Sequence, residues 1–345
     1  MQPCQKDSRS FFEKLQNAEG LDLRDNRGKR HDLAIVLVGV TMAVLANRDG
    51  NLSSIERHLK NHYERLTKVL GVGKKRPVSR SQLPLILEKV AVEVFDDLIF
   101  SHFGIKLSEK ERKWFAIDGK ELRGSIERGA KRGEALVQAV RHENGQTSAQ
   151  TYYCGNKESE VGAVRSLLEK DELLKQKISF DALHCKAQTL EMIALAKGKY
   201  LVGLKENQKE LLNQVKNKME NQAILWERTN VEKGHGRIEV RRFEFYDILE
   251  MAKAERWRGC QMRTAIKIKR VREELKSGKK SCETSYYVTN ETGNYEELTQ
   301  AIRNHWQVET SNHVRDVTLK EDYLRTKKRR SVESWRKCEH WQAQF

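Results

Sequence analysis

The first third of the chain repeats apolar residues at helical spacing. An unbroken apolar run occupies residues 33–46, and apolar positions recur every three to four residues across 55–70 and 83–103. Residues 71–82 instead combine glycine, proline and charge, which favours a loop between the last two helices. We therefore predict a small helical domain over residues 1–105. Helix-turn-helix DNA binding and a plain helical bundle are its two alternative interpretations.

A second pattern begins near residue 113. Short apolar runs with strand character come first in series and then alternate with helical segments, an order that predicts an α/β core with a mixed sheet. We assign the first part of this core to residues 106–208. The predicted strands are 114–117, 135–140, 150–154, 178–180 and 200–204, and the predicted helices are 160–168 and 187–196.

The pattern changes again after residue 208. Apolar and polar residues alternate with period two, which predicts a β-rich insertion at 209–295 with one basic face. A helical pattern then returns within residues 296–326, where we place a late helix of the core. The predicted strands of the insertion are 237–246, 265–272 and 285–289, and the predicted late helix is 296–313.

The apolar run at 33–46 favours a core helix and not a membrane span. It has 14 residues, whereas a spanning helix needs about 20. It also begins too far from the N-terminus, behind too many charges, for a secretory signal. No two of the six cysteines have C-x-x-C spacing, so the sequence predicts neither a zinc site nor a disulfide framework. We expect no membrane partner, free thiols and a cytoplasmic location.

The charge favours a polyanionic partner. Lysine and arginine number 65 against 49 aspartates and glutamates, a formal net charge of +16. Nucleic acid is the common partner of such a protein, because each neutralised phosphate releases a condensed counterion. A ribosome or an anionic membrane surface remains an alternative at this level. The basic residues recur in five runs, at 24–30, 74–80, 120–132, 263–280 and 325–330.

Asp118 and Asp181 each follow a predicted buried strand. Ligands gather at the carboxyl ends of strands in open α/β sheets, although a lone aspartate there more often caps a helix or forms a turn. Two such carboxylates in a basic protein favour a divalent cation beside a phosphodiester, because Mg²⁺ prefers oxygen ligands. Two ions need a third carboxylate as well. Glu309 on the late helix is the best candidate, and the competing residues are Glu160, Glu206, Asp316 and Asp322.

Several segments resemble a known family when they are taken together and in order. The chain is similar to the DDE insertion-sequence transposases of the H-repeat-associated (ISAs-type) family over roughly residues 20–326. The resemblance implies an RNase H-like catalytic core interrupted by a β-rich insertion. The segments are FAIDGKELRGS at 115–125, NKESE at 156–160, FDALHCKAQT at 180–189, YLVGLKENQKEL at 200–211, GHGRIEVR at 234–241, RNHWQVET at 303–310 and DVTLKEDYLR at 316–325.

The resemblance also implies a mechanism and its partners. Asp118, Asp181 and Glu309 would hold two ions of Mg²⁺ or Mn²⁺ and catalyse cleavage and strand transfer by in-line phosphoryl transfer. The DNA partners would be the terminal repeats of the element and a target, bound by a homodimer or a higher multimer. His184 would orient a carboxylate or serve as a structural histidine. The predicted phosphate contacts are Lys120, Arg123, Lys205, Arg237, Arg303 and His305.

Two departures from the family pattern bear on activity. Thr310 and Val314 stand where the family usually has asparagine and an aromatic residue, which leaves the role of Asp316 open. The tail at 327–345 is polar and has no helical periodicity, as in a truncated or frameshifted end. Two alternatives to an active transposase therefore remain. One is a catalytically inactive DNA-binding relic, and the other is a metal-dependent nuclease that performs no strand transfer.

Overall fold

The computed structural model describes most of the chain, which divides into two compact units. One unit comprises Met1–Leu107, Glu121–Glu134 and Asn312–Phe345, and the other comprises Ser108–Lys120 and Ala135–Ser311. The predicted phosphate contact Arg123 and the tail at 327–345 lie outside the described residues. Those residues are 9–46, 52–73, 76–103, 112–121, 126, 134–154, 157–170, 172–249 and 255–318.

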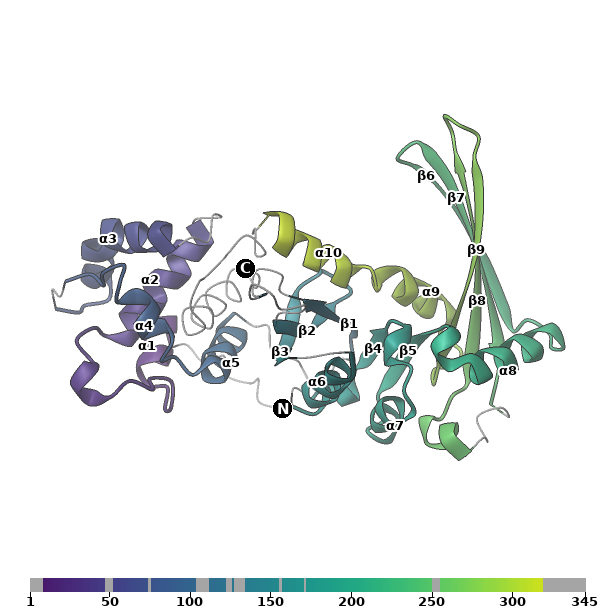
Figure 1. Cartoon of the computed structure of the whole chain (residues 1–345), viewed down its shortest axis with the longest axis horizontal. Helices are drawn as coiled ribbons and strands as arrows, with labels where there is room; N and C mark the ends of the chain where they lie inside the picture. Colours follow the sequence, from purple (N-terminus) through teal and green to yellow (C-terminus); the bar gives the residue numbers. More distant parts are fainter. Residues whose placement is uncertain are drawn as a thin grey trace, which may run out of the picture. The chain divides into compact units, whose positions relative to one another are not determined.

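The N-terminal region is helical, as the sequence predicts (Figure 1). The apolar faces of its helices meet in one core that includes Leu37, Leu59 and Phe95. The described helices are α1 (Phe11–Gln16), α2 (Leu33–Ala46), α3 (Leu52–Val69), α4 (Leu83–Leu87) and α5 (Val92–His102), with a short 3₁₀ turn η1 (Asn26–Gly28) between α1 and α2.

Helix α2 is the centre of this core and has the predicted bounds. Ten of its 14 residues are buried in the helical core, whereas Met42 and Leu45 are exposed. Gly39 lies where α3 crosses: a Cβ atom there would come within 2.3 Å of Cδ2 of Leu59. No helix in the described part of the chain is long and apolar enough to cross a membrane.

The single helix predicted at 83–103 is wrong, because the structure divides it into α4 and α5. The residues between the two helices hydrogen-bond to the segment before α2. Leu23 donates its N–H to the carbonyl of Lys89 at 2.9 Å, and Ala91 donates to the carbonyl of Leu21 at 3.0 Å. In a continuous helix these backbone groups would form hydrogen bonds within the helix. Their pairing with residues 21–23 therefore interrupts it.

The second unit is built on one nine-stranded mixed sheet. Strands β1, β4 and β5 are parallel, whereas β5 pairs with β9 in antiparallel fashion and β9, β8, β7 and β6 continue so to the edge. The strand order is β3-β2-β1-β4-β5-β9-β8-β7-β6. The strands are β1 (Trp114–Glu121), β2 (Glu134–Arg141), β3 (Thr147–Cys154), β4 (Lys177–Phe180), β5 (Lys199–Leu204), β6 (Trp226–Gly234), β7 (Arg237–Asp247), β8 (Thr264–Glu274) and β9 (Lys280–Thr289).

The segment predicted as a β-rich insertion continues the core sheet. It begins with a helix, α8 (Lys209–Glu220), and its strands join the core through the pairing of β5 with β9. Strand β6 was absent from the prediction, because its alternating residues are mostly polar and its pattern is mostly exposed. The insertion and the core are therefore one sheet and not two.

Helices cover both faces of the core part of this sheet (Figure 1). Helices α6 (Lys157–Lys170) and α7 (Ala187–Leu195) lie on one face, and α9 (Tyr295–Asn304) and α10 (Gln307–His313) lie on the other. Leu298 and Ala301 of α9 pack against Trp114 and Leu201 of the sheet. The short helical turns are η3 (Leu173–Lys175), η4 (Ala182–His184), η5 (Glu206–Gln208), η7 (Glu255–Cys260) and the π-helical turn η8 (Val314–Thr318).

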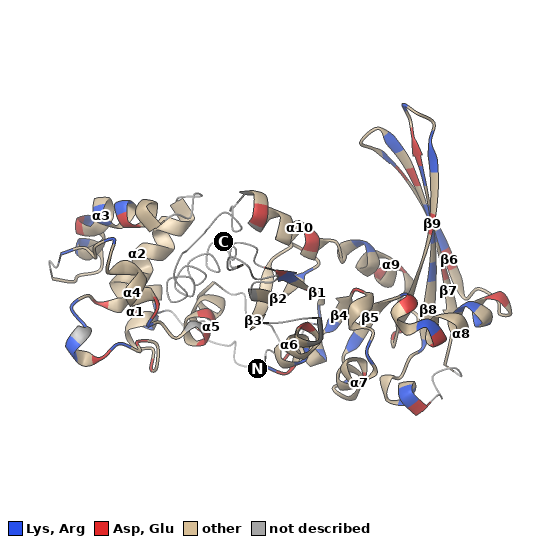
Figure 2. Ribbon diagram, viewed as in Figure 1, with Lys and Arg blue, Asp and Glu red and all other residues tan. Residues whose placement is uncertain are grey.

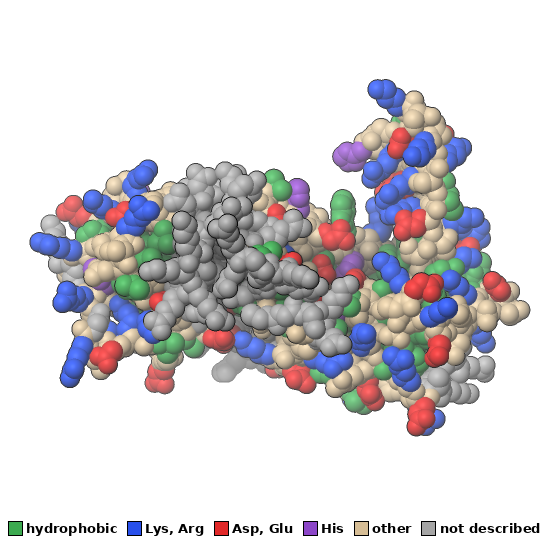
Figure 3. Space-filling view, viewed as in Figure 1, with side chains coloured by type: hydrophobic (Ala, Val, Ile, Leu, Met, Phe, Trp, Pro, Cys, Tyr) green, Lys and Arg blue, Asp and Glu red, His purple; other side chains and the backbone are tan. Residues whose placement is uncertain are grey.

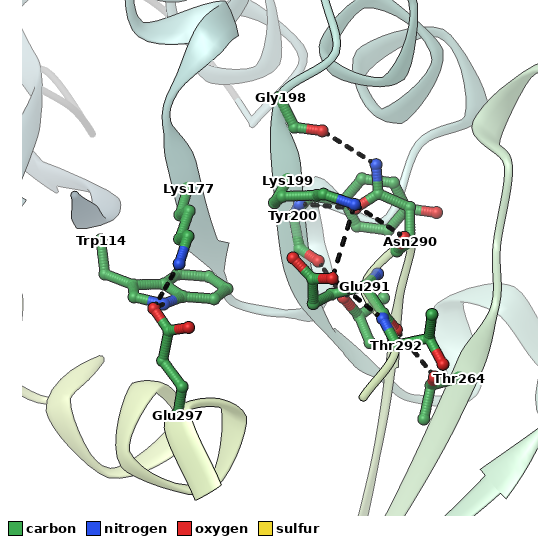
Figure 4. A network of polar contacts seen from close by, with 11 residues as sticks. Trp114, Lys177, Gly198, Lys199, Tyr200, Thr264, Asn290, Glu291, Thr292 and Glu297 are labelled. Atoms are coloured by element: carbon green, nitrogen blue, oxygen red, sulfur yellow. Dashed lines mark hydrogen bonds and ion pairs between the residues drawn. The ribbon is translucent and has the colours of Figure 1, made fainter. Parts of the chain in front are cut away.

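Two sets of polar contacts hold α9 and β9 against the core strands (Figure 4). Glu297 at the start of α9 accepts a hydrogen bond from Nε1 of Trp114 at 2.8 Å and pairs with Nζ of Lys177 at 2.5 Å. Beyond the end of β9, Oδ1 of Asn290 accepts the N–H of Tyr200 at 2.9 Å. The first set ties α9 to β1 and β4, and the second ties β9 to β5.

The Gly39 contact predicts an overpacked variant. We expect Gly39→Val to lower the free energy of unfolding of the helical unit by about 1–3 kcal/mol, because the added side chain collides with Leu59. Thermal unfolding measures the loss, and adding Leu59→Ala should recover part of it. Leu45→Val, at an exposed site of α2, should change stability by less than about 0.5 kcal/mol. A tolerated Gly39→Val would contradict the packing.

Candidate active site

The parallel pairing of β1 with β4 places Asp118 beside Asp181. The last residues in register are Ile117 and Phe180, so the next position along each chain is an aspartate. Neighbouring strands lie about 4.8 Å apart, which brings the two carboxylates to one end of the sheet. Asp181 follows the last residue of β4, and its Oδ1 accepts the N–H of Leu183 at 2.9 Å. This hydrogen bond caps η4 and holds the aspartate at the strand end.

The electrostatic surroundings of Asp118 oppose its ionisation. Burial raises the pKa of the Asp118 carboxyl to about 7, and repulsion by Asp181 acts in the same direction. The hydrogen bond from the N–H of Gly119 lowers this pKa, Glu160 raises it again and His184 lowers it. The two aspartates therefore repel each other in the absence of a counter-ion.

Helix α10 covers the face of the sheet toward which Asp118 points. Val308 of α10 is buried in a cluster with Ala116 of β1 and Val140 of β2. Ala116 and Asp118 are two residues apart on one strand, so their side chains share a face. Glu309 follows Val308 and is exposed. Within the described ranges, no group of three or more acidic, histidine or cysteine residues could hold a metal ion, so Glu309 does not join the two aspartates in such a group.

The helix predicted at 296–313 is interrupted at His305, which makes that prediction wrong as a single element. Nδ1 of His305 lies 2.8 Å from Oγ of Ser179 on β4, and the same oxygen lies 2.9 Å from Nε2 of His142. Burial lowers the pKa of His305 to about 4 and that of His142 to about 3, so both rings are neutral near pH 7. His305, predicted as a phosphate contact, thus binds the sheet through Nδ1.

The other predicted phosphate contacts have different surroundings. Lys120 is buried on β1, and Lys205, just after β5, is exposed. Arg237 and Arg303 form ion pairs with glutamates of the β6–β7 hairpin. Of the predicted phosphate contacts that the structure describes, Lys205 alone is exposed with a side chain that makes no ion pair or hydrogen bond among the described residues.

The carboxylates that compete with Glu309 for the role of third ligand lie in different parts of the structure. Glu160 on α6 lies against Gly119, beside Asp118. Glu206 is exposed in η5, and Asp316 lies in η8. The remaining competitor, Asp322, lies outside the described residues.

Comparison with known protein families shows which family has this sequence and fold. The family described as "Transposase DDE domain" matches residues 109–336, more than half of the chain. The chain belongs to this family. The match contains both aspartates and the whole nine-stranded sheet of this DDE transposase.

Individual relatives agree with the family. The chain is 27% identical over 325 residues to "Putative transposase YncI" of Escherichia coli O157:H7, which covers 90% of this chain and 81% of that protein. It is 25% identical over 332 residues to "H repeat-associated putative transposase YhhI" of E. coli K12, covering 92% and 86%. A third relative, "Uncharacterized protein in dhlA 3'region" of Xanthobacter autotrophicus, is 33% identical over 181 residues, covering 51% and 60%.

The two aspartates of this DDE transposase suit a divalent cation. Their donor atoms are carboxylate oxygens, which Mg²⁺ and Mn²⁺ prefer. A cation between the strand ends would offset the repulsion that helps to raise the pKa of Asp118. The residues present therefore fit the metal chemistry that the family generally uses.

The structure also shows contacts that sequence reasoning missed. Ser179 joins two histidines from different elements, and Tyr153 at the end of β3 donates to Glu160 at 3.0 Å. Strand periodicity marks Ser179 as facing the same side as Asp181, which was the available signal. Nothing in the local pattern of Tyr153 indicates its partner.

The lowered pKa of His305 predicts a pH-dependent contribution to stability. The unfolded state takes up a proton below about pH 6.5, whereas the folded ring resists protonation to about pH 4. The parent should be more stable than His305→Gln near neutral pH. This difference in the free energy of unfolding should decrease, on the order of 1–3 kcal/mol, as the pH falls from 6.5 to 4. Denaturant unfolding across this range measures it. His313→Gln, at an exposed site of α10, serves as the control, and a difference that grows at low pH would contradict the assignment.

Proposed function

We propose that this DDE transposase cleaves DNA at the ends of an insertion element and joins the released 3′ ends to a target. The observation that carries the proposal is the register of β1 against β4, which sets Asp118 next to Asp181. The family, the net charge of +16 and the donor chemistry of the pair support it. DNA supplies the phosphodiester that such a pair requires.

Each side chain receives a role in this proposal. Asp118 and Asp181 hold Mg²⁺ or Mn²⁺, and Glu309 is the third ligand that the resemblance implies, carried by α10 on the face toward which Asp118 points but not grouped with the two aspartates in this structure. Two such ions, when bound, activate the attacking hydroxyl group and stabilise the leaving 3′ oxygen. Exposed Lys205 contacts a phosphate near the strand ends, and His305 positions α10 through Ser179.

The outer end of β6–β9 supports DNA as the partner, whereas the rest of this surface is largely balanced in charge. Basic and acidic residues alternate along these strands, and several arginines pair with glutamates, as Arg242 does with Glu227 at 2.7 Å (Figure 2). Lysine and arginine side chains also gather on the end of the strands that lies away from the core (Figure 3). The exposed ones include Lys233, Arg237, Lys269, Lys276 and Lys279.

The three carboxylates predict a set of inactive variants. We expect Asp118→Asn, Asp181→Asn and Glu309→Gln each to lose metal-dependent cleavage of a labelled duplex carrying the terminal repeat, by roughly 10²-fold or more, while DNA binding persists. The matched control is Asp247→Asn, because Asp247 also accepts a backbone N–H two residues ahead, that of Leu249, but lies at the end of β7. Electrophoresis of the products and of the complexes measures both properties.

The same assay separates the alternatives. Joined products establish strand transfer, whereas nicks alone identify a nuclease. Binding by the parent protein without any cleavage identifies an inactive relic. Cleavage that survives in Asp118→Asn or Asp181→Asn would refute the assigned site.

The raised pKa of Asp118 predicts a pH dependence of metal binding. The carboxyl must lose its proton before it binds Mn²⁺, and its pKa is about 7. The affinity for Mn²⁺ should therefore rise by up to about tenfold between pH 6 and pH 8, with proton release near pH 7. Calorimetry in buffers of different ionisation enthalpy measures both. Affinity that does not change with pH would contradict the assignment.

A further inference from the structure

The carboxylate of Glu160 is held by side chains from two other elements. Tyr153 on β3 donates its hydroxyl to Oε2 at 3.0 Å, and Nε2 of His184 on η4 lies 3.2 Å from Oε1. His184 is fully buried. These contacts connect α6 to β3 and to the turn that Asp181 caps, so the position of Glu160 is fixed relative to the turn that carries Asp181.

Gly119 leaves the space that this carboxylate occupies. A Cβ atom at residue 119 would lie 2.6 Å from Cδ and 2.8 Å from Oε1 of Glu160, too close for any real side chain. Successive residues of a strand face opposite sides, so Gly119 faces α6 while Asp118 faces α10. The missing side chain therefore lets Glu160 reach the strand end beside Asp118 from the opposite side of the sheet.

This arrangement is unfavourable without a cation. Glu160 adds a third negative group beside two aspartates that already repel each other, and like charges at such a site destabilise the ionised forms. Neither ring nitrogen of fully buried His184 makes a hydrogen bond among the described residues, although Nε2 points toward Glu160 at 3.2 Å. A buried nitrogen without a hydrogen bond requires an explanation, and a bound ion or water beside the Glu160 carboxylate is one.

We propose that Glu160 is a supporting carboxylate beside the divalent-cation site of Asp118 and Asp181, on the α6 side of the sheet, where it acts on the ion through its charge and not as a ligand. Tyr153 and His184 orient it, and Gly119 admits it. Its charge adds to the field in which Asp118 and Asp181 bind the ion, as supporting carboxylates do around metal ligands. The inference rests on the proposed function, because it assumes that the two aspartates bind a cation.

The first test measures Mn²⁺ affinity of the full chain without DNA, by electron paramagnetic resonance of free Mn²⁺. Glu160→Gln keeps the shape and can keep both polar contacts, so it should bind Mn²⁺ about tenfold or more weakly, while its metal-free melting temperature is not lower than that of the parent because a repelling charge is removed. Glu169→Gln makes the same change at an exposed site of α6 and should bind as the parent does. Parental affinity in Glu160→Gln would overturn the inference.

A second pair of variants tests the path through Gly119. Gly119→Ala should displace the Glu160 carboxylate and weaken Mn²⁺ binding in the parent background. The same change should have much less effect in a Glu160→Ala background, because the colliding carboxylate is gone. Losses that simply add would overturn the proposed path.

The outcomes separate this inference from the proposed function. If the parent binds Mn²⁺ and Asp118→Asn abolishes binding while Glu160→Gln does not weaken it, only the role of Glu160 fails. If the parent binds no Mn²⁺, the cation site itself fails and this inference falls with it.

Discussion

The side-by-side pairing of β1 with β4 is the constraint on which the site depends. Parallel register carries two buried strands to one end of the sheet, and an aspartate follows the last register pair on each. Backbone hydrogen bonds of the sheet oppose the repulsion between the carboxylates, so the fold holds charges together that would separate in solution. A shift of one residue in this register would turn one aspartate to the other face of the sheet. The stability of the sheet is therefore what preorganises the site.

Helices on the two faces of the sheet each bring a different carboxylate toward the two aspartates. From one face, α10 is docked by the apolar contact of Val308 and by the hydrogen bond of His305 to Ser179, and it carries Glu309. From the other face, α6 brings Glu160 to the strand through the space at Gly119. The surroundings of the two aspartates thus consist of contacts among elements that are far apart in sequence, with His305 and Gly119 among the residues that position them.

Local pattern predicted the elements whose own residues determine them. Helix α2 has its predicted bounds because most of its apolar run is buried, and the core strands begin within three residues of their predicted starts, although β1 continues through Asp118 to Glu121 instead of ending before it. Prediction failed where a distant partner decides. The backbone of Lys89 and Ala91 pairs with the segment before α2 and divides one expected helix, and His305 divides another at Ser179. The polar edge strand β6 and the merging of the insertion with the core sheet depend on long-range pairing that no local period reveals.

The central claim is that a divalent cation binds between Asp118 on β1 and Asp181 at the end of β4. Crystals of the protein soaked with Mn²⁺, with anomalous data collected at the manganese edge, would test it most directly. The account predicts an anomalous peak in contact with the carboxylates of Asp118 and Asp181, absent from crystals of Asp118→Asn. Fully occupied manganese elsewhere, with none between these two carboxylates, would contradict it.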